Sequence, residues 1–234
     1  MLNESKVKKF WDSRSALYNK LPFESIVNME HDPELLKIKV QDETAKVFSW
    51  LPSLKGKSIL DLGAGVGQWT FRFHAQGASR IVAVEYSEPL VEIGRFEAQS
   101  RQAENIEFIV SGAEDFRSNE RFDVIFISGL FVYLNDRQVE TLISNLKNVV
   151  HDDTIIMLRD GTGLAERYEI NNQFSELLQT EYSALYRTAQ EYKAVFKRVG
   201  FETLKDENMF PEGHVLNKYP ETRLRLYYFG KCHG

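Results

Sequence analysis

The sequence has little of what disulfide frameworks and metal centres require. Only one of its 234 residues is a cysteine, Cys232. A single thiol cannot close an internal disulfide, so the cysteine framework of small secreted domains is excluded. The five histidines are scattered, and neither a Cys-x-x-Cys nor a His-Glu-x-x-His spacing occurs. The sequence therefore predicts no bound metal.

Long apolar runs and an excess of positive charge are also missing. No run approaches the roughly 20 residues that a helix needs to span a bilayer. The opening stretch "MLNESKVKKFWDS" is polar and charged, unlike a secretory signal. The net charge of −5 argues against a basic face for nucleic acid. We expect a cytoplasmic globular protein, a monomer or homodimer, with a small-molecule partner and neither nucleic acid nor membrane.

Beyond residue 58, strand-like apolar runs alternate with helical patterns. Helices are expected near 67–76, after Ser87, at 136–150 and at 189–200. Strands are expected at 58–62, 79–86, 105–110, 121–129, 153–161, 201–210 and 223–232. This alternation predicts an α/β fold with a doubly wound, mostly parallel, seven-stranded Rossmann-like sheet. No helix separates the last two strands, which favours an antiparallel last strand.

Two segments do not fit the alternation. Residues 1–55 are expected to form an N-terminal helical cap with helices at 7–18 and 32–51. Residues 161–187 are expected to form a lid insert after the fifth strand. Neither segment is expected to be an independent domain.

A glycine-rich loop follows the first predicted strand, in "SILDLGAGVGQWT". Ligands of open α/β sheets bind beyond the carboxyl ends of the strands, so this loop is the expected binding loop. Its spacing is G-x-G-x-G, whereas the dinucleotide fingerprint requires a sixth-position glycine where Gln68 stands. No Gly-Lys-Ser/Thr follows, which excludes a P-loop. Asp61 precedes the glycines, and Glu85 ends the second strand, where a carboxylate can accept both hydroxyls of a ribose.

With these features, residues 58–160 resemble a class I S-adenosylmethionine-dependent methyltransferase of the small-molecule type. The resemblance implies that residues 56–234 form the domain that binds S-adenosylmethionine and releases S-adenosylhomocysteine. It implies an ammonium contact for Asp61, ribose binding for Glu85, and a cofactor-closing aromatic at Trp11 or Tyr18. The remaining cofactor contacts that it implies are Gly63, Ala64, Gly65, Gly67, Tyr86, Ala113, Glu114 and Ser128. Gly112 stands where the family often has an acidic residue that bonds the adenine, so either Glu114 or backbone takes that role or the adenine is held more loosely.

Each of these residues also has a purely structural interpretation. Glu85 could be a solvated strand-end charge, Asp61 a turn or helix cap, and Ser128 the end of a strand. Trp11 and Tyr18 could be the buried face of a helix. The combination of residues, and none of them alone, favours the cofactor site.

For the acceptor, the candidates for a catalytic role are Asp160, His31 and Tyr18. Asp160 stands near the carboxyl end of the fifth strand, where the alternative is a turn former in "RDGTG". Arginines and tyrosines suit a sugar, a phosphate ester or a carboxylate. The candidates for substrate binding are Arg159, Arg167, Tyr182, Tyr186, Arg187 and Tyr133. The alternative for the insert is a solvated amphipathic helix with its aromatic residues in the core.

The expected function is methyl transfer from S-adenosylmethionine to an oxygen or nitrogen of a polar small molecule. Two alternatives stay open at this point. One is a nicotinamide-dependent oxidoreductase, although the missing sixth-position glycine speaks against it. The other is a non-catalytic protein that binds S-adenosylmethionine.

Overall fold

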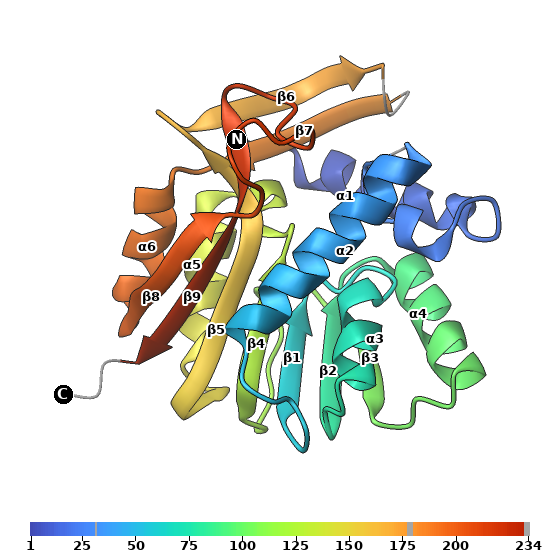
Figure 1. The fold of residues 1–234 in the computed structure, drawn as a ribbon, viewed down its shortest axis with the longest axis vertical. Coiled ribbons are helices and arrows are strands. Elements are labelled where there is room, and N and C mark those ends of the chain that lie inside the picture. The colour runs from blue at the N-terminus through green and yellow to red at the C-terminus, as the bar shows by residue number, and fades with distance from the viewer. Residues whose placement is uncertain (31, 177–179, 232–234) are drawn as a thin grey trace.

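The computed structural model describes residues 1–30, 32–176 and 180–231 and is built around one large sheet (Figure 1). Its seven strands lie in the order β3-β2-β1-β4-β5-β9-β8. The first five are parallel, and β9 runs antiparallel to both of its neighbours. The predicted fold class, including the antiparallel last strand, is confirmed.

The strands of this sheet begin and end close to the predicted positions. They are β1 (Ser58–Leu62), β2 (Arg80–Glu85), β3 (Ile106–Val110), β4 (Phe122–Ser128), β5 (Val150–Gly163), β8 (Phe201–Asn208) and β9 (Thr222–Lys231). The helices between them are α3 (Gln68–Ala75), α4 (Glu88–Ser100), α5 (Asp136–Leu146) and α6 (Ala189–Lys197). A short 3-10 turn, η3 (Phe131–Tyr133), follows β4.

Helices cover both faces of the sheet because its central strands have apolar residues on both sides. On one face, α5 and α6 bury residues such as Leu142 and Phe196 against the sheet. On the other, α3 packs Trp69 and Phe73 against Ile59 of β1. Alternate residues of each strand therefore pack against the helices on opposite faces of the sheet. Loops at the carboxyl ends of the parallel strands are left to form a site.

The N-terminal segment is helical, as predicted, and lies at the carboxyl ends of the parallel strands (Figure 1). It contains α1 (Glu4–Arg14), the short turns η1 (Ser15–Leu17) and η2 (Phe23–Ser25), and α2 (Pro33–Trp50). Asp32 caps α2 by accepting from the backbone N–H groups of Glu34 and Leu35, and Pro33 stands in the first turn. Both features are typical of helix starts.

The insert is a β-hairpin made of β6 (Tyr168–Ser175) and β7 (Thr180–Tyr186). The alternative of an amphipathic helix is therefore wrong. The alternative of a turn at "RDGTG" is also wrong, because β5 continues through Asp160 to Gly163 in register with β9. One side of β7 packs on α1, where the rings of Phe10 and Tyr182 lie 5.8 Å apart. The hairpin and α1 thus lie on the same end of the sheet (Figure 1).

Among the described residues, no helix has the length and apolar character that crossing a bilayer demands.

Candidate functional site

A cavity of about 620 Å³ lies at the carboxyl ends of β1, β2, β4 and β5. Residues from α1, α2, the β6–β7 hairpin and the segment between β8 and β9 complete its wall. Its floor is the glycine loop, and its rim includes Tyr168 and Tyr219. Most of the residues that the sequence predicts for cofactor and acceptor line this one space.

The glycine loop presents bare main chain to the cavity. Gly63 and Gly65 have φ of +74° and +57°, a left-handed conformation that favours glycine. A Cβ on Gly63 would lie 3.1 Å from Leu130, and one on Gly65 would lie 3.0 Å from Val27. Side chains at these positions would crowd the neighbours and fill the space above the loop.

Gly67 serves a different purpose. It does not line the cavity, and a Cβ there would come within 2.6 Å of the Phe108 ring. With φ of +92° it begins α3 and lets that helix approach β3 closely. The close packing of α3 against β3 therefore explains why a glycine stands at position 67.

Asp61 joins β1 to α3 and also lines the cavity. Its Oδ2 accepts a hydrogen bond from Thr70 Oγ1 at 2.7 Å. Burial raises the pKa of Asp61 to about 7. A cation placed beside this carboxylate would favour its ionised form and be held by it. The position suits the ammonium contact that the resemblance implies.

Glu85 ends β2 and is buried at the cavity wall. Its Oε2 accepts from the Gly65 N–H at 3.0 Å, and its Oε1 accepts from the Ser87 N–H at 2.9 Å. Burial raises the pKa of Glu85, while these backbone donors favour its ionised form. A carboxylate has about four acceptor positions, so these backbone donors leave room for ligand hydroxyls. A solvated strand-end charge is ruled out by the burial.

The neighbouring wall carries Tyr86, Ala113 and Glu114. The hydroxyl of Tyr86 is buried and has no hydrogen-bond partner among the described residues. Glu114 Oε1 accepts from Gln138 Nε2 at 2.6 Å. A Cβ on Gly112 would lie 3.1 Å from Glu114 Oε2. The Glu114 carboxylate therefore occupies the neighbourhood that an acidic residue at position 112 would fill.

On the β5 side, Asp160 is fully buried and lines the cavity. Its two oxygens accept from the backbone N–H groups of Phe131 and Gly161, each at 2.7 Å. Burial raises the pKa of Asp160 to about 6. At neutral pH it is an ionised carboxylate that can accept a proton.

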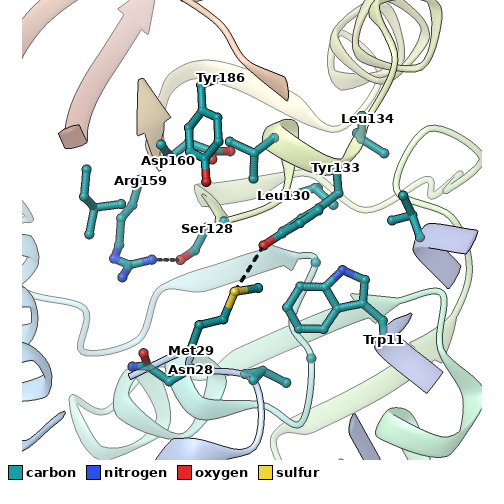
Figure 2. Close-up of a pocket in the computed structure, with 18 of the residues that line it drawn as sticks. Trp11, Asn28, Met29, Ser128, Leu130, Tyr133, Leu134, Arg159, Asp160 and Tyr186 are labelled. Carbon is teal, nitrogen blue, oxygen red and sulfur yellow. Dashed lines mark hydrogen bonds between the residues drawn. The ribbon is translucent and has the colours of Figure 1, made fainter. Parts of the chain in front are cut away.

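Three tyrosines surround the same part of the cavity. The hydroxyls of Tyr133 and Tyr182 lie 2.9 Å apart, and Tyr186 lines the same part of the cavity. Burial holds the pKa of all three phenols well above their usual value, so they are neutral. Figure 2 shows Tyr133, Tyr186 and Trp11 facing a common space, and the Trp11 and Tyr133 rings meet edge to face at 5.0 Å.

Arg159 reaches the cavity from the strand position next to Asp160. Its guanidinium donates to Ser128 Oγ at 2.9 Å, drawn in Figure 2, and to Glu43 Oε1 of α2 at 2.5 Å. Glu43 and Arg159 are both buried, with 3% and 11% of their side chains exposed. The charge of Arg159 is thus already balanced within the protein.

Comparisons with known proteins agree with this geometry. Residues 59–153 match the family described as "Methyltransferase domain". This match and the shared fold support a class I S-adenosylmethionine-dependent methyltransferase. The match confirms the resemblance over these residues, and the nicotinamide alternative is not favoured.

Relatives of this chain include phosphoethanolamine N-methyltransferases. Phosphoethanolamine N-methyltransferase 1 of Triticum aestivum is 28% identical over 198 residues, which are 83% of this chain and 36% of that protein. The chain spans about a third of the length of the two wheat relatives that it matches.

Solved structures share the fold. Phosphoethanolamine N-methyltransferase 1 of Haemonchus contortus, solved with phosphoethanolamine and S-adenosylhomocysteine, has a TM-score of 0.73 at 19% identity, covering 99% of this chain and 50% of that one. The 1,6-didemethyltoxoflavin-N1-methyltransferase of Burkholderia thailandensis has a TM-score of 0.69 at 16% identity, covering 99% and 91%.

Several of the predicted site residues lie outside the cavity. Tyr18 does not line the cavity, and its hydroxyl donates to Glu97 of α4 at 2.7 Å. Arg167 is at the surface, where it pairs with Asp136 at 2.8 Å and with Glu191. His31 lies outside the described residues.

Arg187 is buried but has a structural environment. Its guanidinium donates to the carbonyl oxygens of Phe131 and Leu134, each at 2.7 Å, and to Asp136 Oδ1. Only 2% of its side chain is exposed, and it does not line the cavity. Arg187 anchors the end of β7 to η3, the segment that carries Tyr133 into the cavity.

We expect Arg187→Met to destabilise the protein by about 3 kcal/mol, because buried carbonyl groups that lose a charged donor cost about 1–3 kcal/mol each. The melting temperature should fall by roughly 6–12 °C for a chain of this size. A thermal unfolding experiment measures this change in melting temperature. Arg198→Met is the matched control, since the Arg198 side chain is 66% exposed in its ion pair with Glu140. Equal melting temperatures for the two variants would contradict the anchoring role.

The sequence analysis missed the part of the site that α2 supplies. Lys39 and Glu43 line the cavity, as does Gln138 of α5. The only signal in the sequence was the i, i+4 spacing of Lys39 and Glu43, which puts both on one helix face. Nothing local shows that this face meets β5.

Proposed function

We propose that this chain is an enzyme that transfers a methyl group from S-adenosylmethionine to a nitrogen or oxygen of a polar small molecule. The observation that carries the proposal is the cavity itself, which brings together bare glycine main chain, the buried carboxylate of Glu85, and Asp160 with its neighbouring tyrosines. A non-catalytic binding protein is less favoured, because the acceptor region contains the ionised, buried Asp160.

The residues fit the cofactor on structural grounds. Gly63 and Gly65 leave space that a Cβ would fill, and Tyr86 offers a buried hydroxyl without a partner among the described residues. Asp61 and Glu85 supply carboxylates that suit an ammonium group and a pair of ribose hydroxyls. When bound, S-adenosylmethionine supplies a methyl group on a good leaving group. The chain's own contribution is then alignment and exclusion of water.

Asp160 and the tyrosines would orient the acceptor. The neutral phenols of Tyr133 and Tyr186 can hydrogen-bond it, and their pKa values are too high for them to act as bases. Asp160 is the group that can take the proton which the acceptor loses. Trp11 and the β6–β7 hairpin would serve as a cap and lid over the reaction.

Relatives supply the first acceptor to try. The wheat enzymes are phosphoethanolamine N-methyltransferases, and phosphoethanolamine combines an amine with a phosphate ester. Phosphoethanolamine is therefore our first candidate, within the broader class of sugars, phosphate esters and carboxylates. A cytoplasmic location and a monomeric or dimeric state stay predictions.

Two measurements test the proposal. Titration calorimetry with S-adenosylhomocysteine should give a micromolar Kd, and radiolabelled S-adenosylmethionine should label an acceptor from a panel that contains phosphoethanolamine. Failure to bind S-adenosylhomocysteine would overturn the whole proposal. Binding without transfer to any acceptor of the panel would favour the non-catalytic alternative.

A further inference from the structure

The acceptor side of the cavity contains a cluster of charges from three separate segments. Lys39 and Glu43 come from α2, Arg159 from β5, and Lys218 from the segment between β8 and β9. Glu30, which precedes α2, completes it. Within the described part of the chain this cluster has three cationic and two anionic side chains.

Both carboxylates of the cluster are committed to other cations. Glu43 accepts from Arg159 at 2.5 Å, and Glu30 Oε2 lies 2.6 Å from Lys218 Nζ. Lys39 Nζ donates instead to the neutral amide of Asn28, with Oδ1 at 2.8 Å. No carboxylate of the described residues lies within 4.0 Å of Lys39 Nζ. Lys39 is thus the cation of the cluster whose charge is not balanced by direct contact.

The environment of Lys39 makes that charge costly. Burial lowers the pKa of Lys39, and the positive charges of Arg159 and Lys218 lower it further, while Glu43 and Glu30 oppose the effect. A half-buried ammonium with no carboxylate in direct contact is stabilised when an anion binds to it. The cavity wall beside Lys39 therefore favours the binding of a negatively charged group.

The lining around the glycine loop has the opposite character. Asp61, Glu85 and Glu114 line that part of the cavity. An anionic group would be repelled by these carboxylates and attracted to Lys39.

We propose that Lys39 is the residue that recognises an anionic group of the methyl acceptor, a phosphate ester or a carboxylate, at the α2 side of the cavity. The inference rests on the proposed function, since it assigns the acceptor class of that same site. Arg159, which the sequence analysis expected to bind substrate, is instead a positioning residue held by Glu43 and Ser128.

Inorganic phosphate, titrated into protein saturated with S-adenosylhomocysteine, tests this assignment. We expect Lys39→Met to raise the phosphate Kd about tenfold or more, because a hydrogen bond to a charged group is lost. Lys37→Met is the matched control, since Lys37 is an exposed lysine of the same helix, and its Kd should stay within about twofold of the original, as surface charges contribute little. Lys39→Arg keeps the charge and should retain most of the affinity.

A second variant leaves Lys39 in place. Asn28→Asp is nearly isosteric and puts a carboxylate on the atom that already accepts from Lys39 Nζ. It should weaken phosphate binding by a similar factor, because Lys39 would gain an internal counter-ion.

Three outcomes would overturn the assignment. The first is no phosphate binding by the original protein. The second is an equal phosphate Kd for Lys39→Met and Lys37→Met. The third is a loss of S-adenosylhomocysteine affinity in Lys39→Met, which would assign Lys39 to the carboxylate of the cofactor. Absence of S-adenosylhomocysteine binding by the original protein would instead refute the proposed function.

Discussion

Glu85→Ala should raise the Kd for S-adenosylhomocysteine at least about 100-fold, because two hydrogen bonds to a charged group are worth about 1.5–3 kcal/mol each. The carboxylate also accepts from the Gly65 and Ser87 N–H groups, so its removal loosens the glycine loop itself. Titration calorimetry measures the change directly. A loss of this size would place the ribose hydroxyls on Glu85.

The control for this variant is Glu88→Ala, which removes an exposed carboxylate three residues away. The Kd of Glu88→Ala for S-adenosylhomocysteine should match that of the original protein. If Glu85→Ala does not fold, Glu85→Gln keeps the shape of the side chain and can still accept one backbone hydrogen bond. A Kd for Glu85→Gln or Glu85→Ala within twofold of the original would refute the cofactor arrangement proposed above.

Asp160→Asn should lower kcat about 100-fold or more, in the range usual for loss of a general base. Only the ionised carboxylate accepts a proton, so the rate of the original enzyme should fall as the pH drops below the pKa of about 6. The variant should lack this acidic limb, since an amide does not titrate. Initial rates between pH 5 and 8, with an acceptor from the panel, measure both effects.

A structural role for Asp160 would give a different pattern. Its oxygens hold the Phe131 and Gly161 N–H groups, so misfolding would also lower S-adenosylhomocysteine affinity and melting temperature. We expect the S-adenosylhomocysteine affinity and the melting temperature of Asp160→Asn to stay close to the values for Asp153→Asn. Asp153 is an exposed aspartate of the same strand. An unchanged pH profile in Asp160→Asn would exclude Asp160 as the base.

The nucleoside half of the site could be predicted because its determinants are local in the chain. The strand from Ser58 to Leu62, the glycines after it and Glu85 at the end of β2 form one continuous pattern. Parallel neighbours bring the carboxyl ends of β1 and β2 to the same edge. Once the pattern was recognised, the positions of Asp61 and Glu85 in the cavity followed from strand order alone.

The acceptor half could not be predicted in the same way. Arg159 looked like a free cation for substrate, but Glu43, 116 residues away in sequence, neutralises it. Arg187 looked similar and is a buried anchor for η3. An arginine's role depends on which carboxylates and carbonyl groups surround it after folding, and the amino-acid pattern does not contain that information.

The sequence by itself determined the fold class, the binding edge and the carboxylates of the nucleoside half, because periodicity and turn chemistry act over a few residues. Only the tertiary structure decided which charges stay unbalanced and which aromatic residues meet. Tyr133 and Tyr182 share a hydrogen bond across 49 residues, and Lys39 faces the cavity only because α2 crosses the end of the sheet. Contacts of this kind depend on how whole elements pack, and packing is settled by the complete fold.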